Sequence, residues 1–387
     1  MISLIKSAIK QTPITLPDNF DWNEAIRIAE RHHIIPLIYL GAHISGIELP
    51  TREIRQLKTG TYKATILDEN QKNELSILFQ TFSHSGIDYM PLKGIVLKQL
   101  YPSPEMREMS DADILIRLEQ YTEIAKIMLK LGYHEVVESD HELIWSQPPF
   151  MTIELHKRLI PSYNKDYYAV FGDGWQLARR SDIDWHRYEM LPEDQLVYLF
   201  THFAKHYRDG GIGIKHFVDL LLYMDTNLGL NMEYVKAELT KLQLYEFFQN
   251  VHNTIDVWFN DTDSNEMSDF ITKRLFASGA YGADDEKTVA ASVKRLKAMG
   301  SASHVQRRNI LDLIFLPYPS MCVKYPILRR IPFILPVFWI IRAVQTALFK
   351  PDNIRKRRDK IRIASKENIN RYHDELVYVG LDFNFKE

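Results

Sequence analysis

Apolar residues recur at helical intervals through the first part of the chain. The segment 19–30 begins with Asn and Asp residues, and its apolar positions then repeat every three or four residues, which predicts a helix. A second helix is predicted over 62–84, ending before a glycine. The N-terminal segment is apolar but interrupted by lysines, so we interpret this segment as a helix of the mature protein and not as a signal peptide.

The pattern changes from a helical to a period-two spacing after residue 84. A helix is predicted to open at Gly94, and another over 119–131 is closed by Gly132. Alternating or β-branched runs predict strands at 87–90, 111–116, 133–137, 142–145 and 151–156. Strand, helix, strand, helix and then consecutive strands favour a small mixed sheet with helices packed on it.

The chain returns to helical spacing after Pro192. We therefore predict an α+β fold: a small mixed-sheet core embedded between N-terminal helices and a mainly helical C-terminal region. The length of 387 residues allows several domains. The predicted regions are N-terminal helices over 1–84, the core over 85–190, a helical domain over 191–300 and a helical, basic extension over 301–387.

Composition narrows the class of protein. An apolar fraction of 45% and a charged fraction of 25% are typical of folded soluble domains and exclude wholesale disorder. The formal net charge of −2 argues against a protein that binds nucleic acid with its whole surface. The single cysteine, Cys322, excludes an internal disulfide and a multi-cysteine zinc site, and it fits a reducing, cytoplasmic location.

The segment 331–349 is apolar but contains two prolines, an arginine and a glutamine, so no transmembrane helix is predicted. Basic residues flank it on both sides. Three interpretations of 329–362 stay open: a peripheral membrane contact, an RNA-backbone contact, or a buried helix followed by a solvated basic helix. The third is the simplest.

Two aspartates on one predicted strand are the strongest chemical signal. Side chains alternate along a strand, so Asp111 and Asp113 point to the same face, about 6.6–6.8 Å apart along the backbone. Two carboxylates so placed repel each other unless a cation lies between them, and Mg²⁺ suits them. The alternative is an exposed edge strand with two solvated aspartates.

A later strand and an upstream turn add to this signal. The same alternation places Thr152, Glu154 and His156 on one face of the strand 151–156, and a neighbouring position would bring three carboxylates together. Such a trio can hold two metal ions. Upstream, Gly94 lets backbone N–H groups approach a phosphate, and Lys93 adds a positive charge.

These residues resemble a known family. A small-residue turn opening a helix, then D-x-D on a strand, then a third carboxylate on a later strand is similar to the DNA polymerase β-like nucleotidyltransferase superfamily. The wording PLKG, LYPSPEMREMSDADILI, LGY and IELHKRL more closely resembles the bacterial uncharacterised nucleotidyltransferase family. The specific part of the resemblance covers 93–156.

The resemblance implies a function for several residues. It makes Asp111, Asp113 and Glu154 the metal ligands and catalytic carboxylates, with Glu154 able to bind the second metal or act as base. Lys93 and Gly94 would form the nucleotide-phosphate turn, although the wider superfamily usually has Gly-Ser or Gly-Gly where this chain has Gly94-Ile95.

Other residues are predicted to contact the nucleotide. Ser110, directly before the first aspartate, is one of them. Arg107 is either a phosphate clamp or a surface charge paired with Glu105 or Glu108. His156 contacts the acceptor, orients Glu154 or is an ordinary core histidine. Lys205 lies between His202 and His206, on a helix face that either lines the nucleotide cleft or packs against other helices.

The sequence thus predicts an enzyme that transfers a nucleoside monophosphate from an NTP, such as ATP, to an acceptor hydroxyl with Mg²⁺ or Mn²⁺. The acceptor stays open between a protein, an RNA end, a small molecule and an envelope sugar phosphate. A glycosyltransferase is an alternative because D-x-D also binds metal and nucleotide diphosphate, but it leaves the later E-L-H strand unexplained. A non-catalytic scaffold with the same fold is the third alternative.

Overall fold

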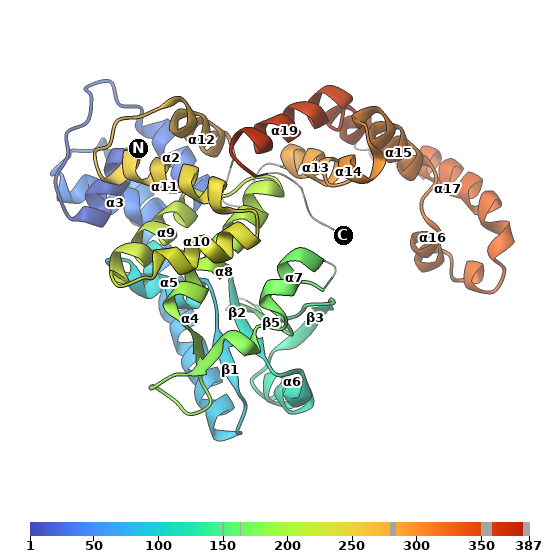
Figure 1. Ribbon diagram of the computed structural model, residues 1–387, viewed down its shortest axis with the longest axis horizontal. Coiled ribbons are helices and arrows are strands. Elements are labelled where there is room, and N and C mark those ends of the chain that lie inside the picture. The colour runs from blue at the N-terminus through green and yellow to red at the C-terminus, as the bar shows by residue number, and fades with distance from the viewer. Residues whose placement is uncertain (149–150, 163, 279–283, 350–357, 382–387) are drawn as a thin grey trace. The chain divides into compact units, whose positions relative to one another are not determined.

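The computed structural model describes residues 1–148, 151–162, 164–278, 284–349 and 358–381 (Figure 1). They form two compact units. The first comprises 1–204 and 212–280 with the last four residues, and the second comprises 205–211 and 281–383. The four regions expected from the sequence divide the chain more finely and stay a prediction.

A five-stranded mixed sheet lies in the first unit, which confirms the predicted α+β class. Its strand order is β1-β2-β5-β4-β3, and β2 runs parallel to β5 while the other neighbours are antiparallel. The strands are β1 (Tyr89–Pro91), β2 (Asp111–Ile116), β3 (His134–Glu138), β4 (Glu142–Gln147) and β5 (Met151–His156). A separate hairpin pairs β6 (Ala178–Arg180) with β7 (Tyr188–Met190).

One face of this sheet is the apolar core of the unit. Ala112 and Ile114 of β2 and Ile153 and Leu155 of β5 are fully buried against α4 (Thr51–His84) and α6 (Tyr121–Lys130), which lie beside the sheet in Figure 1. Alternation then forces the intervening side chains of both strands to the opposite face. That opposite face is therefore where polar residues can gather.

Helices make up the rest of the first unit. The predicted helix 62–84 begins eleven residues earlier than expected, as part of α4. The polar residues over 260–268 predict a loop from the sequence, but the loop is shorter because α12 begins at Glu266. The other helices are α1 (Ile2–Lys10), α2 (Trp22–His32), α3 (Ile35–Ile44), α5 (Gly94–Leu97), α7 (Lys165–Phe171), α8 (Pro192–Arg208), α9 (Ile214–Thr226), α10 (Met232–Lys241), α11 (Tyr245–Phe259) and α12 (Glu266–Ala277).

An aromatic core joins α8, α9 and α11. Phe203 packs edge-on against Phe217 with 5.0 Å between ring centroids, and Phe217 lies 4.9 Å from Trp258. Phe200 and Phe247 complete the cluster at 5.5 Å. Buried aromatic pairs of this kind combine large apolar area with preferred geometry, so they fix the helices that carry them.

A buried ion pair attaches the segment before β2 to α9. Arg107 donates two hydrogen bonds to Asp219, from Nε and Nη2, each 2.9 Å long, and the Tyr101 hydroxyl also donates to Asp219 at 2.9 Å. Burial disfavours the guanidinium charge, yet the adjacent Asp219 carboxylate holds the pKa of Arg107 above its ordinary value. This pair is 112 residues apart in sequence.

The second unit is helical. Its helices, beyond the end of α8, are α13 (Asp284–Val293), α14 (Leu296–Met299), α15 (Ala302–Ile314), α16 (Tyr318–Lys324), α17 (Leu335–Phe349) and α19 (Lys366–Tyr378). The glycines over 278–285 predict a loop from the sequence, and this segment lies largely outside the described residues. No helix among the described residues is long and apolar enough to cross a membrane.

Asp219→Asn is expected to destabilise the protein by about 3–5 kcal/mol, because it leaves the Arg107 guanidinium buried without its countercharge. The free energy of unfolding in urea, followed by tryptophan fluorescence, measures the loss. The exposed pair between Arg27 and Glu24 is the control, and Glu24→Gln should cost far less than Asp219→Asn because solvent screens the pair. An equal loss in the two variants would contradict the stabilising role of the buried pair.

Candidate active site

Four acidic side chains share the polar face of the sheet. The register sets Asp113 of β2 opposite Glu154 of β5, and Asp111 opposite Thr152. Glu142 of β4 lies opposite His156 and so joins the same face. β2 lies between β1 and β5, so the alternative of an exposed edge strand is wrong. The convergence of three carboxylates predicted from the two strand motifs is present.

Asp113 is the centre of this group. It is 5% exposed, and its Oδ1 accepts hydrogen bonds from Lys93 Nζ at 2.6 Å and from His156 Nε2 at 2.7 Å. Burial opposes its charge, but Lys93 and His156 outweigh burial and hold the pKa of Asp113 well below its ordinary range. The same carboxylate holds the pKa of Lys93 above its ordinary value. Asp113 and Lys93 are therefore a charged pair.

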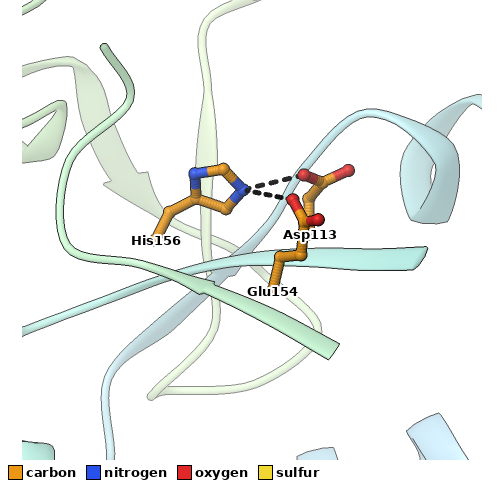
Figure 2. Close-up of side chains that lie close together, drawn as sticks. All are labelled: Asp113, Glu154 and His156. Carbon is orange, nitrogen blue, oxygen red and sulfur yellow. Dashed lines mark hydrogen bonds and ion pairs between the residues drawn. The ribbon is translucent and has the colours of Figure 1, made fainter. Parts of the chain in front are cut away.

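Glu154 lies beside this pair and has no lysine or arginine ion pair of its own within the described residues. Its Oε2 is 3.7 Å from His156 Nε2, and Figure 2 shows the imidazole facing both carboxylates. Burial, with the charges of Asp113 and Asp111, raises the pKa of Glu154 to about 8. Burial and the nearby Lys93 charge lower the pKa of His156. Burial and the neighbouring negative charges therefore disfavour ionisation of the Glu154 carboxyl.

Asp111 is more open than Asp113. It is half-buried, and its Oδ1 accepts a hydrogen bond from the Ser110 hydroxyl at 3.0 Å. Its charge acts on Glu154 and also on Lys215 of α9. Asp111 and Ser110 therefore lie where a ligand from solvent would first meet the carboxylates.

The predicted phosphate turn has two unusual backbone features. Lys93 has a φ of 43°, in the half of conformational space that residues with a Cβ rarely use. A Cβ on Gly94 would lie 2.8 Å from Met109 Sδ and 2.9 Å from Arg107 Nη1, so only glycine fits without displacing them. The turn is tightly built and directs Lys93 to Asp113.

Arg107 is not a surface charge. Its bidentate partner is Asp219, so the alternative pairing with Glu105 or Glu108 is wrong. Glu108 instead lies 3.3 Å from His33 Nδ1. Nothing in the sequence signals this pair, because Asp219 lies 112 residues after Arg107 and local patterns do not indicate contacts over that separation. Whether Arg107 contacts a phosphate stays a prediction.

Two further residues of the site have no sequence motif. Tyr198 of α8 is fully buried, and its hydroxyl has no hydrogen-bond partner within the described chain. Burial raises the pKa of Tyr198 to about 12, while Lys93, Asp113 and Glu154 all act on it electrostatically. Lys215 of α9 is buried, which with the Arg107 charge lowers the pKa of Lys215 to about 8. Both helices thus reach the acidic face.

The other predicted positions are on α8. His202 and Lys205 follow Tyr198 by four and seven residues, so helical spacing places all three on one side of this helix. His202, Lys205 and His206 are half-buried. Lys205 belongs to the second unit, so its predicted contact with the nucleotide stays a prediction.

The donor set fits a divalent cation. Within the described residues, Asp113, Glu154 and His156 each offer one ligand atom, and these atoms lie within 4.8 Å of one another. Asp111, the remaining predicted ligand, projects from the same face of β2, and its place among the metal ligands stays a prediction. Carboxylate oxygens suit Mg²⁺ and Mn²⁺, and the raised pKa of Glu154 reflects negative charge that a cation would offset.

One family of proteins matches more than half of the chain. A sequence profile described as uncharacterised nucleotidyltransferase matches residues 18–260. A search of curated proteins found no match.

Two solved structures are similar to the chain. One is the antibiotic-resistance factor ANT(2'')-Ia, with 13% identity, a TM-score of 0.35, and coverage of 48% of this chain and 98% of that chain. The other is an antigenic nucleotidyltransferase-like protein from Paracoccidioides brasiliensis, with 17% identity, a TM-score of 0.29, and coverage of 45% and 88%. Because both TM-scores are low, the family assignment depends on the profile.

Glu154→Gln is expected to raise the melting temperature of the metal-free protein near pH 8 and to change it much less near pH 5. The pKa of Glu154 rises from 4.5 to about 8 on folding, so its contribution to stability is lost as the pH rises through that range. Circular dichroism melts in EDTA measure the shift. The exposed Glu119→Gln is the control. A pH-independent shift for Glu154→Gln would contradict the raised pKa.

Tyr198→Phe is expected to leave the free energy of unfolding unchanged or to raise it by up to about 1 kcal/mol, because the buried hydroxyl it removes lacks a partner. Tyr101→Phe is the matched comparison. Its hydroxyl donates to Asp219 at 2.9 Å and lies 3.1 Å from the Lys215 carbonyl oxygen, so its removal should cost about 1–2 kcal/mol. Urea unfolding of both variants measures the difference, and a larger loss in Tyr198→Phe would show a hydrogen bond at that hydroxyl.

Proposed function

Because the chain belongs to the uncharacterised nucleotidyltransferase family, we propose that it transfers a nucleoside monophosphate from an NTP to an acceptor hydroxyl. The acceptor oxygen would form a bond to the α-phosphorus while the bond to the β-phosphate oxygen breaks, releasing pyrophosphate. The observation that supports this is the group of three carboxylates, Asp111, Asp113 and Glu154, on one face of two parallel neighbouring strands.

Asp111, Asp113 and Glu154 would hold the divalent cations, with His156 beside them. When bound, Mg²⁺ or Mn²⁺ would offset the charge of the triphosphate and polarise the reacting oxygens. Asp113 is already positioned by hydrogen bonds from Lys93 and His156, so its carboxylate needs little rearrangement. Preorganised charge of this kind contributes to catalysis without a cost of reorientation.

Glu154 is the candidate for the group that accepts the acceptor's proton. Glu154 lies opposite Asp113 in the strand register and 3.7 Å from His156 Nε2, so it would either bind the second cation or act as this base. Tyr198, whose hydroxyl is unpaired and close to Glu154 and Asp113, is suited to hold the acceptor oxygen at this place. Its role is to position the substrate.

Lys93 and the narrow turn at Gly94 would bind the phosphates of the NTP, Lys93 by its charge and the turn by letting the phosphates approach the backbone. We also assign a contact with the nucleotide to Ser110, which hydrogen-bonds Asp111. Arg107 supports the turn through its Nη1 close to Gly94, in addition to the predicted clamp role.

A non-catalytic scaffold is the second candidate, and one observation favours it. Lys93 already balances the charge of Asp113, so the folded protein can keep this buried carboxylate ionised without a metal ion. A chain that had lost catalysis could be stable in this state. The distinction lies in whether a divalent cation displaces Lys93 from Asp113.

Asp111→Asn with Asp113→Asn is expected to lower transfer at least ~10³-fold, because loss of the preorganised charge removes several kcal/mol of transition-state stabilisation. The assay incubates the protein with labelled ATP, CTP, GTP or UTP, with Mg²⁺ or Mn²⁺, and with an extract containing protein, RNA, small-molecule and envelope sugar phosphate acceptors. Glu119→Gln, an exposed substitution in the turn that follows β2, is the active control.

Label transfer that survives the double substitution would overturn the proposed mechanism. Metal binding by calorimetry without any transfer, in a wild-type protein that is folded, would support the scaffold instead. A glycosyltransferase would be indicated by transfer from UDP-sugars and none from NTPs.

A further inference from the structure

The second unit carries an apolar stripe that faces solvent. On α17, Val337, Ile340, Ile341 and Val344 are all exposed, and the spacing of three, one and three residues places them on one side of the helix. Phe333, in the turn before α17, extends the stripe and is 82% exposed. The simplest prediction for this segment, a buried helix, is therefore wrong for these residues.

The opposite side of α17 is packed, so the stripe does not arise from a loose helix. Phe338 and Trp339 lie against the small core formed by Met321, Cys322 and Leu328. The Trp339 indole also donates a hydrogen bond of 2.9 Å to the Leu316 carbonyl. The helix thus has one face held by its own unit and one aliphatic face without a partner among the described residues.

The charge around the stripe has a single dominant sign. Residues 313–351 contain no Asp or Glu, and 313–362 contain eleven Lys and Arg against two Asp. Lys324, Arg329 and Arg330 are exposed next to the stripe. The whole chain has a net charge of −2, so this segment is a strongly basic part of a nearly neutral protein.

We infer that α17 and the turn before it bind flat on an anionic lipid surface, with the stripe Phe333, Val337, Ile340, Ile341 and Val344 in the headgroup–acyl boundary and the arginines at the lipid phosphates. An apolar helix face with basic flanks is the pattern of an interfacial helix. None of the described helices can cross a bilayer, which fits an in-plane contact. The inference does not depend on the transfer reaction.

Lipid fits this surface better than the other occupants. RNA would bind the arginines, but aliphatic Val and Ile side chains offer its bases neither stacking nor hydrogen bonds. A symmetric contact between two copies would bring the same basic segment against itself, and like charges repel. An anionic bilayer complements both the apolar stripe and the positive charge beside it.

Flotation of the full-length protein with phosphatidylcholine vesicles, with and without phosphatidylserine, tests this inference. We expect binding to the phosphatidylserine vesicles, weakened by salt because charge attraction is screened. Ile340→Gln with Val344→Gln should lower binding about 10-fold or more, because each removes apolar area from the bilayer. Arg329→Gln with Arg330→Gln should weaken binding by about 10-fold as well, at low salt only.

Val136→Gln with Val137→Gln is the matched control. These two valines are exposed on β3 in the first unit, so the substitutions change a similar apolar area elsewhere and should leave vesicle binding unchanged. Far-UV circular dichroism confirms that each variant is folded.

Three results would overturn the inference. One is no flotation of the wild-type protein with phosphatidylserine vesicles. Another is tighter binding to a single-stranded RNA that the arginine variant loses and the Ile340 variant keeps. The third is a dimer, seen by light scattering, that the Ile340 and Val344 substitutions dissociate while vesicle binding is absent.

Discussion

Carboxylates that share one buried face must have a cation among them, and the site is built around that constraint. Asp113 is almost fully buried and stays charged because Lys93 and His156 both bind its Oδ1. Glu154, one strand away, has no equivalent partner, and its pKa rises to about 8. The two acids thus differ in charge because their surroundings differ.

The rest of the first unit holds this face in place from two sides. Below the sheet, α4 and α6 bury the alternate residues of β2 and β5. On the polar side, the aromatic core fixes α8 and α9, which supply Tyr198 and Lys215. The buried Arg107–Asp219 pair links α9 to the segment that leads into β2. Apolar packing therefore sets the position of groups that are themselves polar.

Local pattern predicted the parts of the site that depend on local geometry. The bounds of β2 and β5 follow from alternation, which also placed Asp111, Asp113 and Glu154 on a common face before their strands were known to pair. The partner of Arg107, the hydroxyl of Tyr198 and the burial of Lys215 depend on helices that pack against the sheet from about a hundred residues away. No spacing rule reaches that far, because such contacts are set by tertiary packing.

The exposed face of α17 was misjudged for a related reason. Its apolar residues suggested burial, but hydrophobicity alone does not say which side of a helix has a partner. In the parallel pairing of β2 with β5, by contrast, the register determines which face of the sheet each side chain lies on. A slip of one residue would turn Ile114 and Leu155 outward and put the carboxylates into the core. Misregistered molecules are therefore too unstable to accumulate, so the fraction of chains with an assembled site should equal the fraction that is folded.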